Sequence, residues 1–276
     1  MANAPTKPTT TPKKESSSAS GLFATLAIPI CIVISICIFI FILGDPSHYA
    51  GGDVKEGEPD IFGTVHRGGV LVPLVMSYVL MVIVFSIERF IVIGKASGTS
   101  SIDSFVRRIQ GFLNTGNIDA ASAECDKQKG SVANVIKAGL KKYKEMENEA
   151  TLDVDQKTLA IQKDIEEATA LEMPMLEQNL TIIATLVSIG TLTGLLGTVV
   201  GMIKAFAELA GQSTNTTKLS SAISEALVNT AMGITTSALS IVMYNVFTSK
   251  IDGLTYAIDE TGFSIVQTFA ASHKNK

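Results

Sequence analysis

The sequence lacks most of the residues from which catalytic and metal sites are built. It has no tryptophan, three histidines and three cysteines, and no CxxC, HExxH or GxxxxGKST pattern. The histidines stand at no metal-ligand spacing, and three cysteines make no disulfide framework. Cys31 and Cys37 lie in an apolar stretch, where cysteine acts as a small hydrophobic side chain. We therefore expect no cofactor, no metal and no enzymatic activity.

Charge is also scarce. Only 17% of the residues are charged, against roughly a quarter in soluble domains, while 46% are hydrophobic and the mean hydropathy is +0.35. This deficit indicates a membrane protein. The formal net charge of −4 provides no strongly basic surface, so the composition does not support a role with nucleic acid.

Four apolar stretches are long enough to cross a bilayer as helices. They are residues 21–43, 68–94, 179–210 and 219–248. For the first stretch, a cleaved signal peptide is the competing interpretation, but its apolar core would be only about 7–15 residues long. We therefore expect an extra, uncleaved N-terminal transmembrane helix. The preceding residues 1–20 are rich in Pro, Thr, Ser and Lys, which predicts a disordered tail.

The segments between the spans predict the orientation. The loop 44–67 carries five acidic residues against Lys55 and Arg67, and 211–218 is a short polar turn. Lysine and arginine collect instead in the N-terminal tail, just after the second span and near the C-terminus. By the positive-inside rule, both termini and the polar region 95–178 face the cytoplasm, and the loop and the turn face the periplasm.

Helical periodicity continues beyond the fourth span. Within the C-terminal segment 249–276, apolar residues recur at spacings of three, four and seven; they are Ile251, Leu254, Ile258, Ile265 and Phe269. One apolar stripe of this kind predicts that the fourth span continues as a helix outside the membrane. We predict an all-α integral membrane protein with four transmembrane helices, the last two long and extending into a cytoplasmic helical bundle.

The third span carries two stripes of unusual composition. At about 100° per residue, Thr191 lies about 20° from Thr198, on a hydroxyl stripe. Beside it runs a glycine stripe of Gly190, Gly194, Gly197 and Gly201. A glycine inside a helix costs about 1 kcal/mol relative to alanine, and small residues let membrane helices approach closely. We predict that the glycines serve helix packing.

The fourth span has a polar arc about 140° wide. It contains Glu225, Asn229, Thr230, Gly233, Thr236, Ser237 and Ser240. Such an arc faces the bundle interior or water rather than lipid, with Gly233 expected in helix packing. Thr198 and Thr230 stand at equal distances from the turn, so antiparallel helices place them at the same depth.

Glu225 is an ionisable residue inside a span, which makes it a functional-site hypothesis. The alternatives are an exposed interfacial carboxylate or a fixed ion pair with Lys204 or Lys218. Because Lys204 and Glu208 stand four residues apart, we expect these two to pair with each other at the interface.

The two polar spans resemble a known family. GLLGTVVGMIKAFAELA, which begins at Gly194, and ISEALVNTAMGI, which begins at Ile223 and precedes MYN, are similar to the ExbB/TolQ/MotA proton-channel family, most closely to ExbB. IER at 87–89 and FLNTGNIDAASAEC also look like this family. The resemblance covers about residues 68–270. The two motifs together, at this spacing, are the feature that is most specific to the family.

The resemblance implies a homopentamer whose third and fourth spans line a central pore in the bacterial inner membrane. It implies an ExbD-like or TolR-like single-span partner inside that pore, and a TonB-like protein through which proton flow energises transport across the outer membrane. Thr198, Thr230 and Glu225 match the family's polar residues. We expect these three, with Asn229, Ser237 and Thr191, to line a hydrated proton path.

The chain departs from the family pattern in three places. Gly190-Thr191 and Leu239 stand where relatives often have prolines, which puts helix kinks in doubt, and residues 21–43 add a span. Two other functions remain open. One is a TolQ-like or gliding-type stator, which uses the same chemistry for envelope integrity or motility. The other is a non-conducting scaffold, which would need the glycine face but not the polar arc.

Overall fold

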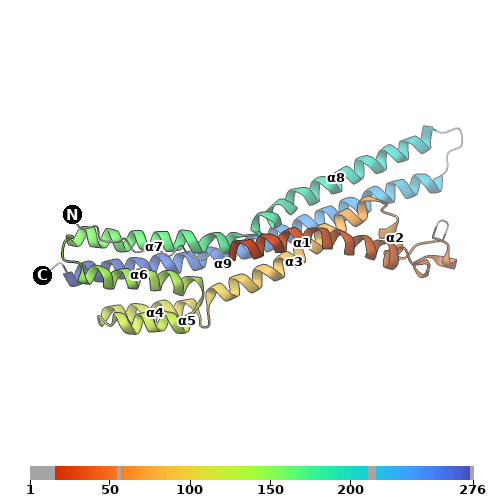
Figure 1. Ribbon diagram of the computed structural model, residues 1–276. Helices are drawn as coiled ribbons and strands as arrows, with labels where there is room; N and C mark the ends of the chain where they lie inside the picture. The colour runs from red at the N-terminus through yellow and green to blue at the C-terminus, as the bar shows by residue number, and fades with distance from the viewer. Residues whose placement is uncertain (1–15, 55–56, 211–215, 274–276) are drawn as a thin grey trace, which may run out of the picture.

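The computed structural model describes residues 16–54, 57–210 and 216–273 and is almost entirely helical (Figure 1). Its helices are α1 (Ser16–Cys37), continued by the π-helical turn η1 (Ile38–Leu43), α2 (Ile61–His66), α3 (Leu71–Ser97), α4 (Ile102–Asn114), α5 (Ile118–Gln128), α6 (Gly130–Asn148), α7 (Val154–Glu177), α8 (Leu180–Ala210) and α9 (Thr216–His273). Most of the predicted disordered tail, residues 1–15, lies outside the described residues, as does most of the turn 211–218.

The molecule is elongated, with α9 running through its whole length (Figure 1). At about 1.5 Å per residue, this one helix is roughly 87 Å long. At one end, the loop end, α3 and α8 pack on the first half of α9, and α1 packs on α3. At the other, the bundle end, α4, α6 and α7 pack on its second half, and α5 packs on α4 and α6 (Figure 1). Within the described residues, α1 with η1, α3, α8 and α9 are long and apolar enough to cross a membrane, which fits an all-α membrane protein.

Apolar side chains hold the bundle end together. The stripe of Ile251, Leu254, Ile258, Ile265 and Phe269 is buried in the core cluster, on an α9 that runs without interruption from the spanning half. Phe105 and Ile109 of α4 are fully buried there, and the Tyr143 ring of α6 meets that of Phe269 edge to face at 4.9 Å. Burial of a large apolar side chain contributes about 1.5–3 kcal/mol, so this core anchors the long α9.

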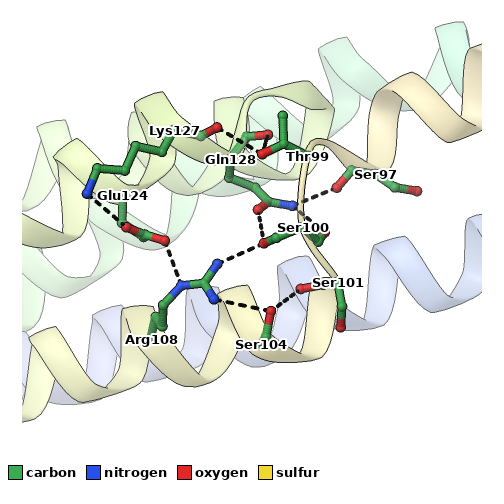
Figure 2. Close-up of polar contacts among 9 residues, drawn as sticks. All are labelled: Ser97, Thr99, Ser100, Ser101, Ser104, Arg108, Glu124, Lys127 and Gln128. Carbon is green, nitrogen blue, oxygen red and sulfur yellow. Dashed lines mark hydrogen bonds and ion pairs between the residues drawn. The ribbon is translucent and has the colours of Figure 1, made fainter.

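A polar joint fastens α3 to the bundle where α3 ends (Figure 2). Gln128 at the end of α5 is 1% exposed, and its Nε2 donates to the backbone oxygens of Ser97 and Ser100 at 2.8 Å each. Arg108 of α4 donates to Glu124 of α5 at 2.6 Å and to the Ser100 hydroxyl at 2.8 Å. The turn between α3 and α4 is thus bonded on both sides, which fixes the end of α3 to α4 and α5.

A second joint lies where α7 passes into α8. Asn179 takes the left-handed backbone conformation (φ 63°), which ends α7 and redirects the chain. Arg89 of α3 is 1% exposed, and its Nη1 donates to the carbonyls of Met175 at 3.2 Å and Leu176 at 3.1 Å. Its Nε donates to Glu88 at 2.6 Å. A cation at a helix C-terminus satisfies carbonyls that have no partner within the helix.

Residues 44–54 and 57–69, the loop module, cover the loop end. Tyr49 is 3% exposed, and its hydroxyl lies 2.8 Å from Nδ1 of His66. The His66 ring also packs on Phe39 of η1, with 4.7 Å between ring centroids. Asp60 caps α2 by accepting from the Gly63 amide at 2.8 Å. The first long helix, α1 with η1, is therefore tied to the loop module through the His66 ring.

The loop module should loosen in mild acid. Burial lowers the pKa of His66 below its ordinary 6.5, so the unfolded segment binds a proton more readily than the folded one. The stabilisation is therefore complete above about pH 6.5 and is lost as the pH falls below it. The protection of the amides in this module against hydrogen exchange, measured relative to their intrinsic exchange rate at each pH, should be lower at pH 5.5 than at pH 7.5.

A variant separates this effect from other titrations. His66→Gln keeps a hydrogen-bonding group beside Tyr49 but does not titrate, so its protection, corrected for the intrinsic exchange rate, should vary much less with pH. Asp60 does not interfere, because the Gly63 amide lowers its pKa below the usual 3.8 and so keeps it ionised in this window. An equal pH dependence in His66→Gln would contradict the assignment.

Candidate functional site

The α8–α9 seam is a contact between two glycine-lined helix faces. Gly190, Gly194, Gly197 and Gly201 are the buried glycines of α8, and the buried Gly233 of α9 faces them. A Cβ on Gly194 would lie 3.1 Å from Cα of Gly233, and one on Gly201 would lie 2.6 Å from Cβ of Ala226. All five glycines predicted to serve packing therefore lie where α8 and α9 touch.

Paired hydroxyl groups bridge the same seam. Thr198 and Thr230 are hydrogen-bonded to each other through their side chains, at the shared depth that the sequence predicts. One heptad nearer the bundle end, Thr191 Oγ1 lies 2.8 Å from Ser237 Oγ. The two pairs are about 10 Å apart along the helices. They form a short row of hydroxyl groups beside the glycines.

These hydroxyls face more acceptors than they have protons. Besides Thr198, Thr230 Oγ1 lies 3.1 Å from the Gly194 carbonyl and 3.0 Å from the Ala226 carbonyl. Ser237 Oγ similarly lies 2.7 Å from the Val187 carbonyl. A hydroxyl donates one hydrogen bond and accepts two, so each can exchange its donor between acceptors without ionising. The row can therefore order water or relay a hydrogen bond, but it does not store a proton.

Glu225 lies toward the loop end, paired across the seam. Its Oε1 is 2.6 Å from Nζ of Lys204, and its side chain is 14% exposed against 50% for the lysine. Lys204 therefore pairs across the seam with Glu225, and the predicted Lys204–Glu208 pair along α8 is wrong. The spacing of one helical turn would allow Lys204 to reach Glu208. The close approach of α8 and α9 instead places Lys204 beside the mostly buried carboxylate of Glu225. Of the alternatives considered for Glu225, an exposed carboxylate or an ion pair, the structure contains the ion pair with Lys204.

Asn229 is directed away from the hydroxyl row. It is 0% exposed, and its Nδ2 donates to the carbonyls of Gly68 at 2.8 Å and Glu225 at 3.0 Å. Its Oδ1 is buried and has no hydrogen-bond partner among the described residues. Asn229 thus fastens the loop module to α9. Sequence reasoning missed this contact because Gly68 is far away in the chain and accepts through its backbone carbonyl, which leaves no pattern in the side chains.

The backbone of the seam is regular. Neither α8 nor α9 contains a proline, and each runs as a single α-helix through the glycine and hydroxyl faces. The chain reaches close contact through the glycines on two regular α-helical faces. The break in direction falls instead at Asn179, outside the seam.

The comparison with protein families covers the helices of the α8–α9 seam. Residues 127–260 match the model of the MotA/TolQ/ExbB proton channel family. The matched range begins near the end of α5 and includes all of α8 and the part of α9 that carries Thr230 and Ser237.

Two curated proteins are similar to the chain. A biopolymer transport protein named ExbB-like 3 from Synechocystis is 36% identical over 88 residues, which are 31% of this chain and 42% of that protein. The Tol-Pal system protein TolQ of Pseudomonas aeruginosa is 24% identical over 196 residues, 69% of this chain and 84% of the relative. The alignment thus spans less than half of the first relative and most of the second.

Proposed function

Because the chain belongs to the MotA/TolQ/ExbB proton channel family, we propose that it is the pore-forming subunit of a motor driven by the proton-motive force. The observation that carries this proposal is the hydroxyl row of the α8–α9 seam. Thr198 bonds to Thr230 and Thr191 to Ser237, on helices long enough to span a membrane. A polar row between two spans is expensive in lipid and marks an ion or proton path.

In this proposal the loop end faces the periplasm and the bundle end the cytoplasm of a bacterial inner membrane. The acidic loop 44–67 and the basic flanks of the second span and C-terminus support that orientation. Glu225 and Lys204 then form the outer mouth of the path, and the hydroxyl row leads inward from it.

The proposed assembly is a homopentamer around an ExbD-like or TolR-like single-span partner. The seam hydroxyls do not titrate, so the protonating carboxylate belongs to the partner, and the row keeps water ordered beside it. The many apolar side chains of α8 and α9 that stay exposed in one subunit, such as Leu195, Val199 and Leu227, support contact with lipid or neighbouring copies.

Two outputs fit this motor. The ExbB-like output, energising TonB-dependent transport across the outer membrane, is supported by the motifs of α8 and α9 and by the 36% identity to the ExbB-like relative. The TolQ-like output, envelope integrity, is supported by the length of the TolQ alignment, 69% of the chain. Identification of the outer-membrane client that co-purifies with the complex separates the two.

The experiment is a proton-flux measurement on the complex purified in mild detergent through a tag on this chain and reconstituted into vesicles. Thr198→Val/Thr230→Val keeps the side-chain shape but removes the bridging hydroxyls. Flux under an imposed gradient should fall on the order of tenfold or more, while the complex still assembles.

The matched control is Thr235→Val. Thr235 lies on the exposed side of α9 and donates only to the backbone oxygen one turn back, at 2.8 Å. This variant should conduct like the wild type. Unchanged flux in Thr198→Val/Thr230→Val would favour a non-conducting scaffold, which needs the glycine contact but not the hydroxyls.

A further inference from the structure

A cleft of about 430 Å³ opens beside the α7–α8 joint, at the bundle end of the seam. It is lined by Glu177, Leu180, Thr181, Ala184, Tyr244, Thr248, Ile251 and Asp252. Three helix segments form its walls: the end of α7, the start of α8 and the middle of α9. The cleft therefore lies where the two long membrane helices leave their mutual contact and the bundle begins.

The cleft continues the face of α9 that carries the hydroxyl row. At about 100° per residue, four polar residues of α9 fall within about 40° of Thr230. They are Ser237, Tyr244, Thr248 and Asp252. On α8, Ala184 lies about 40° from Thr198. One stripe thus leads from the Thr198–Thr230 pair past Ser237 to the floor of the cleft.

The cleft holds two carboxylates that no basic group neutralises. Among the described residues, Glu177 and Asp252 take part in no hydrogen bond or ion pair. Two basic residues are held elsewhere: Arg89, which contacts α7 beside Glu177, and Lys250, which precedes Asp252 by two positions. Arg89 donates to Glu88 and to α7 carbonyls, and Lys250 lies over the Phe90 ring, 4.9 Å from its centroid. The carboxylates are therefore available to solvent protons or to a cation.

One hydroxyl in the cleft has no partner. Thr248 Oγ1 is buried from solvent and forms no hydrogen bond within the described structure. A helical threonine ordinarily donates to the carbonyl one turn back, as Thr236, Thr255 and Thr261 do. A buried polar atom without a partner indicates a bound water or another ligand that supplies the missing bond.

The distance of the cleft from Glu225 matches the thickness of a membrane, as expected for the opposite end of a path across it. Along α9, Glu225 and Asp252 are separated by about 40 Å, at 1.5 Å per residue. A bilayer is about 40–45 Å thick when its headgroup regions are included. A single helix thus places one carboxylate at each surface, with the hydroxyl row between them.

We propose that Glu177 and Asp252, with the hydroxyl of Thr248, form the proton release site of the path on its cytoplasmic side. A proton arriving through ordered water adds to a carboxylate oxygen and gives the neutral acid. The acid then loses it to water in the open cleft, so the carboxylate is regenerated and the net change is one proton moved. This inference rests on the proposed channel function and adds an exit to it.

The test uses the tagged complex in vesicles and the double variant Glu177→Gln/Asp252→Asn, which removes both carboxylates with little change of shape. Flux per complex should fall about tenfold. The conservative pair Glu177→Asp/Asp252→Glu keeps two titrating groups in the cleft and should retain most of the flux. Asp259→Asn is the matched control, because Asp259 lies on the same helix but lines a different cleft.

The outcomes separate the release site from the channel itself. If the wild type and Asp259→Asn conduct and the double variant does not, the release site is supported. If all three conduct equally, the site is overturned while the channel stands. If the double variant loses its partner but conducts normally per intact complex, the cleft is a docking site for a basic tail, which also overturns it. A wild type that does not conduct overturns both proposals.

Discussion

Replacing Gly233 with valine should force α8 and α9 apart and destabilise the protein. A Cβ at Gly233 would lie 2.5 Å from the Gly190 carbonyl oxygen and 2.8 Å from Cα of Gly194. Both are backbone atoms of the regular helix α8, so neither can rotate away. Overpacking of this kind costs about 1–3 kcal/mol, and we expect the upper end because the valine adds two further methyl groups.

Thermal unfolding of the purified protein measures this effect. A loss of about 3 kcal/mol in the free energy of unfolding corresponds to a fall in Tm of roughly 6–12 °C. Gly253→Val is the matched control, because it makes the same change on the same helix at a glycine whose Cβ would meet nothing within 4 Å. It should leave Tm nearly unchanged. Equal losses in the two variants would mean that helix propensity, rather than contact at the seam, explains the result.

Replacing Arg89 with methionine should destabilise the protein by about 3–5 kcal/mol. The side chain is 1% exposed, and its loss leaves the half-buried Glu88 carboxylate and the carbonyls of Met175 and Leu176 without their donor. Methionine fills most of the space, so the cost comes from the unpaired polar groups. Because those carbonyls end α7, the direction in which α8 leaves the joint should also become less well defined.

Two further variants define the role of Arg89. Arg89→Lys keeps the positive charge but lacks the planar guanidinium group, whose several N–H donors reach Glu88 and both carbonyls at once. Its loss of unfolding free energy should therefore be intermediate. Arg107→Met removes an exposed arginine whose Nε contacts one backbone oxygen at 3.4 Å, and it should change Tm little. If Arg89→Met and Arg107→Met lower Tm equally, the joint does not depend on the guanidinium.

Local pattern was enough to predict the spans and the faces of α8 and α9. The four apolar runs are long helices, and Gly190, Gly194, Gly197 and Gly201 fall on one side of α8 because a helix repeats every 3.6 residues. The equal depth of Thr198 and Thr230 followed from a short connection between antiparallel helices. Such features depend on spacing within one element and its nearest neighbour in the chain.

Contacts between distant parts of the chain could not be obtained in that way. Sequence spacing joined Lys204 to Glu208, whereas close helix packing brings it to Glu225. Asn229 shares the polar arc with Thr230 but bonds to the backbone of Gly68. Nothing in the local pattern around Arg89 indicates that it caps α7.

The sequence by itself therefore determined an all-α membrane protein with a glycine face and a hydroxyl face on its last two spans, because periodicity and hydropathy are local properties. The tertiary structure alone decided which groups meet. It paired the hydroxyls across the seam, directed Asn229 to the loop module, and brought Glu177 and Asp252 to one cleft. The physical reason is that a hydrogen bond or a cleft depends on atoms within a few ångströms, and long-range packing sets those distances.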